Sequence, residues 1–141
     1  MPILNYTTKV DVFKTVGEIQ AQLAKHGARK IMLDYENSGK IEAVSFAIDT
    51  PDGLRGIKLP AKSDKVMAVL TKQKVKCDSE QAERVAWRII KTWVDAQMAI
   101  LETEMVCMEE IFLPYMVNKQ GQTFFDAYQN KQLMLCDTSE T

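Results

Sequence analysis

The chain has 141 residues, of which 46% are hydrophobic and 26% are charged, proportions that suit one globular domain. Its formal net charge is −1, which argues against electrostatic steering of the whole molecule towards nucleic acid or an anionic membrane. The charges are nevertheless unevenly spread. Residues 55–91 contain 10 basic and 4 acidic residues (net +6), whereas residues 92–141 contain 2 basic and 8 acidic residues (net −6). These segments could form two functional faces or could pair with each other inside one fold.

Cysteine usage and the N-terminal segment bear on the cellular setting. Cys77, Cys107 and Cys136 are widely spaced and no CxxC motif is present, unlike the cysteines of disulfide-stabilised secreted domains. The first residues show no basic stretch followed by an apolar core, and no apolar run approaches the roughly 20 residues that span a bilayer. We therefore expect a cytoplasmic protein that does not enter a membrane.

The N-terminal part of the chain is expected to form one helix and a small sheet. Apolar residues recur at helical spacing within residues 14–26, and Gly27 provides a stop. Turn signals at 37–39 and 50–53 then separate three segments with strand character. These segments cover residues 29–36, 40–49 and 54–59. Two short turns in series predict a three-stranded antiparallel meander.

The C-terminal part is expected to be helical. Ser63 is placed to cap a helix, and Asp78 with Gln81 three residues later resembles a capping box. The predicted helices cover residues 64–73, 80–104, 107–117 and 123–131. After them, 133–135 is predicted to be a short strand or a docked tail, and 137–141 a frayed end.

Together these elements predict an α+β fold in which a three-stranded antiparallel meander packs against helices. We expect a single domain that covers residues 1–141. Residues 1–60 would supply one helix and the sheet, and residues 61–141 would be mainly helical. The sequence contains no repeat and no low-complexity segment.

The longest predicted helix has a charged ridge and a broad apolar stripe. The ridge consists of Glu80, Arg84, Arg88, Lys91, Asp95 and Glu102. Charges four residues apart can pair along a helix, so a solvated ridge is one interpretation. Trp93 lies in the middle of the apolar stripe and is predicted to belong to the core. Trp87 borders the ridge and is the better candidate for an exposed aromatic residue.

Two surfaces are candidate binding sites. A nucleic-acid-binding surface would combine basic residues with an exposed tryptophan. Its members would be Lys72, Lys74, Lys76, Arg84, Trp87, Arg88 and Lys91. A protein-binding surface would combine carboxylates with apolar side chains among them, and the alternative is that these apolar residues are core. Its members would be Glu102, Glu104, Glu109, Glu110 and Phe112.

Little in the sequence indicates catalysis. His26 is the single histidine, and glycine-rich phosphate loops and nucleophile motifs are absent. The three cysteines and His26 lack the close pairing that is typical of structural zinc ligands. We expect no cofactor and no bound metal, and a small metal-dependent enzyme stays a remote alternative.

One resemblance bears on the biological context. The segment QAERVAWRIIKTWVDAQMAILETEMVCMEEIFLPYMV, residues 81–117, resembles part of a group of small phage- and prophage-encoded proteins of unassigned function. HGARKIMLDYENSGKIEAVSFAI and KLP, upstream, resemble the same group, so the likeness covers about residues 14–130. It implies a protein made inside a bacterium during infection or lysogeny. The order helix, three strands, helix is also similar to the double-stranded-RNA-binding domain, without that family's basic loop, and fold order does not fix function.

The expected function follows from this context and from the two charged segments. We expect a non-catalytic phage-type accessory protein that binds and obstructs a host protein, such as one that handles nucleic acid or acts in defence. The alternative is a nucleic-acid-binding protein of phage replication or recombination. The acidic segment favours the first, since an acidic surface can compete for a nucleic-acid site on a host protein. The basic segment favours the second, and the sequence leaves homo-oligomerisation open.

Overall fold

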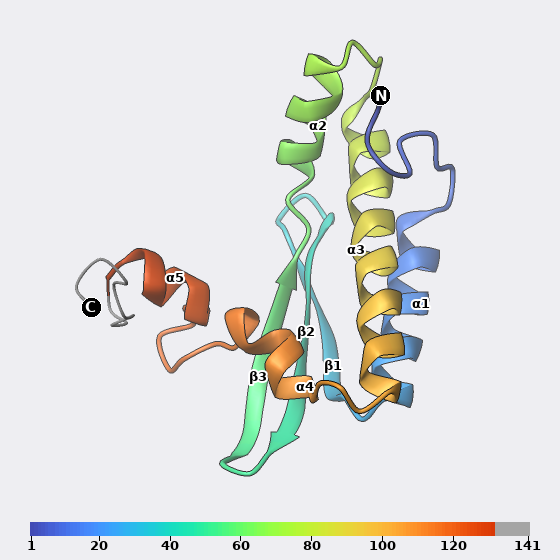
Figure 1. Ribbon diagram of the computed structural model, residues 1–141. Helices are drawn as coiled ribbons and strands as arrows, with labels where there is room; N and C mark the ends of the chain where they lie inside the picture. The colour runs from blue at the N-terminus through green and yellow to red at the C-terminus, as the bar shows by residue number, and fades with distance from the viewer. Residues whose placement is uncertain (132–141) are drawn as a thin grey trace, which may run out of the picture.

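The structure, a computed structural model, describes residues 1–131 and has the predicted α+β class (Figure 1). In chain order its elements are α1 (Val12–Lys25), β1 (Arg29–Tyr35), β2 (Ile41–Thr50), β3 (Gly53–Pro60), α2 (Ser63–Lys72), α3 (Ser79–Glu102), α4 (Met108–Phe112), the 3₁₀ helix η1 (Leu113–Tyr115) and α5 (Phe124–Gln129). The strands pair in the order β1-β2-β3, and both pairs are antiparallel, so the predicted meander is confirmed. The predictions for 133–135 and 137–141, and the position of Cys136, lie outside the described residues.

The β2–β3 hairpin is regular because its turn has the required chemistry. Gly53 adopts a φ of 108°, which residues with a side chain rarely adopt, and the Thr50 hydroxyl donates a 2.7 Å hydrogen bond to its carbonyl oxygen. The pairing then runs without a break from Thr50 opposite Gly53 to Ala43 opposite Pro60. By contrast, β1 shifts register twice against β2, and Lys30 has a φ of 52°. Such irregularity blunts an edge strand against further pairing.

The core lies between one face of the sheet and the helices α1, α3 and α4. Figure 1 shows α1 and α3 side by side along the sheet, with α4 just after the end of α3. The strands contribute Val44, Phe46, Ile48, Ile57 and Leu59 to this core, and the helices contribute Val16, Ile19, Leu23, Trp87, Val94, Met98, Ile111 and Phe112. The helix α2 packs against α3 near its start, whereas α5 stands off to the side of β3 (Figure 1).

The predicted charged ridge of α3 faces α1 rather than open solvent. The two helices run parallel, and polar side chains meet along their seam at matching steps: Thr15 with Arg88, Glu18 with Arg88 and Lys91, Gln22 with Asp95, and His26 with Glu102. The middle of the ridge, at Arg88, Lys91 and Asp95, is therefore half-buried because α1 covers it, whereas Glu80 and Glu102 at its ends are exposed. We call this line of contacts the α1–α3 seam.

The predicted orientation of α3 is wrong for its tryptophans. Trp87 is 1% exposed and sits in the core, whereas Trp93 is half-buried and packs against the edge of the core. The helix packs against α1 and, near its start, against α2, and its buried side chains join those of the strands in the core. Its buried side therefore differs from the centre of the apolar stripe. The prediction that Trp87 is an exposed aromatic residue is therefore wrong.

Several local predictions are also corrected. Ser63 does not cap α2; it lies in the first turn, buried, and its hydroxyl accepts a 2.6 Å hydrogen bond from Lys40. Asp78 caps α3 as predicted, by accepting from the backbone of Gln81 at 2.8 Å, but the Gln81 side chain does not close the capping box. Its amide instead donates to the backbone oxygens of Tyr6 and Thr8 at 3.2 and 2.8 Å, which ties the N-terminal segment to α3.

The predicted helix over 107–117 is shorter than expected. It divides into α4 and the 3₁₀ helix η1, with Pro114 among the first residues of η1. Proline lacks the amide hydrogen that would continue an α-helical ladder, which explains the change.

Candidate functional site

The predicted nucleic-acid surface is not one surface. Trp87 is buried, and Arg88 and Lys91 lie in the α1–α3 seam, where their nitrogens are 3.2 and 3.6 Å from the carboxylate oxygens of Glu18. Arg84 donates to the side-chain oxygen of Gln81 at 2.9 and 2.6 Å. The structure therefore separates Trp87, Arg88 and Lys91 from the three predicted lysines, whereas Arg84 lines a shallow hollow together with Lys76 at the start of α3.

Those three lysines remain exposed. Lys72 ends α2, and Lys74 and Lys76 lie in the connector that leads to α3. They form a small basic cluster at the α2–α3 turn. Trp87, the aromatic residue that was predicted to join them, is not part of it. Phosphate contacts depend on the number of free cations, so the loss of Arg88 and Lys91 removes much of the expected affinity for nucleic acid.

Four residues of the predicted acidic surface flank the turn between α3 and α4, and whether they form one binding surface stays a prediction. We call Glu102, Glu104, Met105, Glu109 and Glu110 the acidic corner. Its carboxylates are exposed except that of the half-buried Glu109, and Met105 is 69% exposed. Within residues 1–131, salt-bridge contact in this set is limited to Glu102, which lies 2.9 Å from His26.

One predicted member does not belong to this surface. Phe112 is 0% exposed and packs edge-on between Phe46 and Trp93, with ring centroids 5.2 and 5.9 Å apart. The apolar residues at 111 and 112 are thus core, as the alternative interpretation held. Both residues join the core because α4 packs against β2.

The pKa values of two carboxyl groups, those of Glu102 and Asp95, are lowered by their surroundings. The hydrogen bond with His26 is the main cause that lowers the pKa of Glu102, and the nearby charge of Lys25 acts in the same direction. For Asp95, burial alone would raise the pKa, but hydrogen bonds from Lys91 and Gln22 and the charge of Arg88 outweigh it, so the pKa is lowered. Both carboxylates are stabilised in their charged form.

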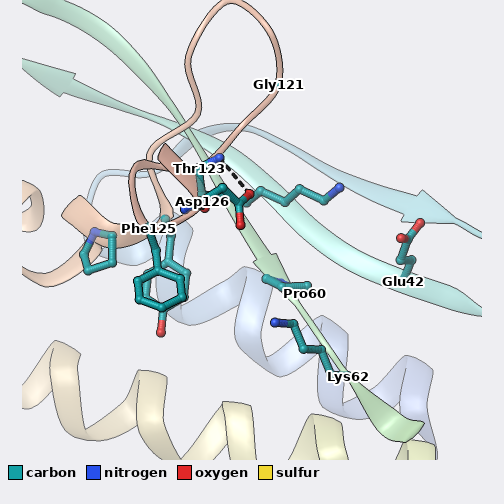
Figure 2. Close-up of a pocket in the computed structure, with 10 residues that line it drawn as sticks. Glu42, Pro60, Lys62, Gly121, Thr123, Phe125 and Asp126 are labelled. Atoms are coloured by element: carbon teal, nitrogen blue, oxygen red, sulfur yellow. Dashed lines mark hydrogen bonds between the residues drawn. The ribbon is translucent and has the colours of Figure 1, made fainter. Parts of the chain in front are cut away.

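A groove that sequence reasoning missed lies between β3 and the segment 113–131, which we call the C-terminal arm. It has a volume of about 440 Å³, and its walls are Glu42, Lys58, Pro60, Lys62, Pro114, Tyr115, Gly121, Thr123, Phe125 and Asp126. Figure 2 shows Phe125 and Glu42 at opposite ends, with Pro60 and Lys62 between them and Asp126 beside Thr123. The groove thus combines aromatic surface with charges of both signs.

The arm is held against β3 by backbone contacts. The amide of Val117 donates to the oxygen of Gly56 at 3.0 Å, and a side chain on Gly56 would come within 3.1 Å of Val117. A reciprocal capping box between Thr123 and Asp126 then starts α5. Glycine at position 56 is therefore what allows this close approach.

The structure describes two of the three cysteines, Cys77 and Cys107. Burial is the main cause that raises the pKa of the Cys77 thiol, with the charge of Asp78 adding to it, so this thiol is less ready to ionise than a free one. Cys107 is exposed. Across the described part of the chain, no three histidine, cysteine, aspartate or glutamate side chains gather as metal ligands. No helix there is both long and apolar enough to cross a bilayer.

Comparison with known proteins adds no family. No protein-family model, no curated protein and no solved structure matches the chain.

Proposed function

We propose that the protein is a non-catalytic binding protein that attaches to a basic surface of a host protein through its acidic corner. The observation that supports this most directly is Met105, which is 69% exposed among exposed carboxylates. A large apolar side chain held in water costs free energy that a partner would recover by covering it. Methionine is unbranched and adapts to irregular partner surfaces.

The carboxylates around Met105 supply the matching electrostatics. Glu104 and Glu110 are exposed and form no salt bridge with any residue of 1–131, so their charges are free to attract a cationic partner. A charged rim around an apolar centre is the usual arrangement of a transient protein interface, and the rim sets the association rate more than the final affinity.

The kind of partner follows from the phage resemblance together with this charge. We infer a protein made in the cytoplasm of a bacterial host, where proteins that handle nucleic acid carry basic surfaces. An acidic corner seated on such a surface would block access of nucleic acid by direct competition. Obstruction of a host enzyme or defence protein is thus the proposed action.

The test requires a variant that changes the corner without changing the fold. Glu110 accepts a hydrogen bond from the Cys107 amide at 3.3 Å and helps to start α4. Reversal of its charge would therefore change the fold and the partner contact together. Glu104 has no such contact, and Glu104→Lys with Met105→Gln alters only exposed groups. Glu36→Lys, in the exposed β1–β2 turn, is the matched control.

The measurement begins with capture from a bacterial lysate and ends with purified components. The captured partner should associate with the wild-type protein at a rate that falls as salt is raised. The double variant should associate several-fold more slowly, while Glu36→Lys should match the wild type. Equal rates for all three proteins would show that the acidic corner is not the contact surface.

A further inference from the structure

The groove between β3 and the C-terminal arm has features that the acidic corner does not use. Its volume of about 440 Å³ lies within the roughly 300–1,000 Å³ of small-molecule sites. It lies beside β3, lined by β3 and the C-terminal arm, whereas the corner lies at the end of α3 (Figure 1). What binds here is therefore a question separate from the proposed function.

One wall of the groove is a rigid aromatic surface. The ring of Tyr115 packs edge-on against Trp93, with centroids 5.8 Å apart, and Trp93 packs in turn on the buried Phe112. Tyr115 is thus fixed by a chain of rings that reaches the core. A ring held in place loses little conformational entropy when a ligand stacks on it.

The C-terminal arm adds three aromatic side chains that are about half exposed. Phe125, which lines the groove, is 50% exposed, and its ring lies 6.1 Å from that of Tyr128 at an angle of 34°. Phe124 and Tyr128 are also more than two-fifths exposed. Three exposed aromatic side chains on a helix of six residues are an unusual concentration of apolar area in water.

The charged groups of the groove are free to meet a ligand. Lys58 is half-buried and Lys62 is exposed, and neither forms a salt bridge with any residue of the described chain. Glu42 is equally without a salt bridge, and Asp126 uses one oxygen to accept from the Thr123 amide at 3.2 Å. Two ammonium groups and two carboxylates thus border an aromatic floor.

We propose that this groove binds a nucleotide whose base is unpaired, either free or within a single strand. The base stacks on Phe125 and Tyr115, and the ammonium groups of Lys58 and Lys62 neutralise the phosphate. The carboxylates of Glu42 and Asp126 accept hydrogen bonds from amino groups of bases, as acidic side chains do with cytosine. Exposed rings beside lysines are the arrangement by which proteins bind single strands.

The continuation of this pattern along the arm favours a nucleotide over a peptide. Beyond the groove, Tyr128 is followed by the exposed Lys131, and the exposed Lys119 lies in the turn before α5. Rings and cations therefore recur outside the groove itself. A strand repeats the same base and phosphate and can use such a recurrence, whereas a peptide would need a matching sequence.

The first experiment measures stacking. Fluorescence anisotropy is recorded with labelled cytidine and uridine oligonucleotides of about 12 residues, within the site sizes known for single-strand binding. Phe125→Leu keeps an apolar side chain but removes the ring face, and should weaken binding roughly 5- to 150-fold, the range that stacking of one base spans. Phe13→Leu, at a ring on α1 that is 61% exposed, is the matched control and should leave the affinity unchanged.

The second experiment counts phosphate contacts. Lys58→Gln with Lys62→Gln should reduce the slope of log affinity against log salt by about 0.7 per lost contact, the value for single strands. Lys74→Gln with Lys76→Gln removes the same charge from the α2–α3 turn and should not change the slope. If the Lys74 and Lys76 pair abolishes binding and the groove variants do not, the groove proposal is overturned in favour of that turn.

The remaining arms identify the source of the ligand. Titration calorimetry with cytidine and adenosine monophosphates distinguishes the two sources. If the ligand is a free nucleotide, a monophosphate binds by itself. If the ligand is a single strand, the oligonucleotides bind and the monophosphates bind too weakly to be measured. Either result supports the proposal that the groove binds a nucleotide, provided that Phe125→Leu weakens the binding that is observed. The proposal fails if neither oligonucleotide nor monophosphate binds at concentrations up to about 1 mM, a limit that corresponds to roughly 4 kcal/mol. Binding of a proline-containing acidic peptide in their place would make this a peptide groove.

Discussion

The basic residues of α3 and the acidic residues that follow it look alike in the sequence, since both are charges among apolar side chains, but they have different environments. Arg88 and Lys91 lie in the α1–α3 seam, paired with Glu18. Glu104 and Met105 are exposed, and nothing in residues 1–131 packs over them. The difference arises because α1 covers one side of α3 along its length, whereas the chain simply turns at the corner. A run of charge predicts a free surface only when its neighbours are known.

The largest expected effect tests which side of α3 is buried. Trp87→Ala should lower the free energy of unfolding by about 3–5 kcal/mol, because a fully buried large aromatic side chain is removed and a cavity is left. Trp93→Ala should cost clearly less, since Trp93 is half-buried and contacts Phe112 and Tyr115 at the edge of the core. Urea denaturation followed by circular dichroism measures both.

The order of the two values decides the orientation of the helix. If Trp93→Ala proved more destabilising than Trp87→Ala, α3 would present the side that the apolar stripe of the sequence predicts, and the seam with α1 would be incorrect.

A smaller effect is expected within the seam itself. Glu18→Gln removes the carboxylate that lies between Arg88 and Lys91, and should destabilise the protein by about 1.5 kcal/mol, the lower end for hydrogen bonds to charged groups. Glu104→Gln at the acidic corner is the same substitution on an exposed side chain and should stay within about 0.5 kcal/mol of the wild type. Equal effects at the two positions would mean that the seam is as solvated as the corner.

Much of the fold was predictable because its signals are local. The turn at Gly53, the stop at Gly27 and the alternation of β2 depend on residues adjacent in sequence, and all three appear in the structure. The length of α3 was predictable for the same reason, since Asp78 marks its start. The orientation of α3 was not, because it depends on how α1, α2 and the sheet share its surface.

The candidate sites show the same limit. The exposure of Glu102, Glu104 and Glu110 was predictable, because they lie at or near the turn between α3 and α4, whereas the burial of Phe112 depends on tertiary packing. The seam could have been anticipated only by matching α1 with α3. Glu18 and Gln22 are four residues apart, as are their partners Lys91 and Asp95. The sequence does not show, however, which helix packs beside α3. The groove was missed because it joins β3 to an arm some 60 residues later in the chain.

The smallest expected effect concerns Glu102, which belongs to both regions: it ends the seam through its 2.9 Å contact with His26, and it begins the acidic corner. Its pKa is lowered in the folded protein, first by the hydrogen bond with His26, so the unfolded chain binds the proton more readily. The stability that this contact contributes is therefore present above the ordinary carboxyl pKa of about 4.3 and is lost as the pH falls through the folded value. Thermal melts between about pH 6 and pH 3 should show a shallower acid decline for Glu102→Gln than for the wild type, because glutamine has no such proton to gain. Glu104→Gln, two residues away and free of a salt bridge, should follow the wild-type curve. Parallel curves for Glu102→Gln and the wild type would mean that the contact with His26 does not persist in solution, and that the seam ends before the corner begins.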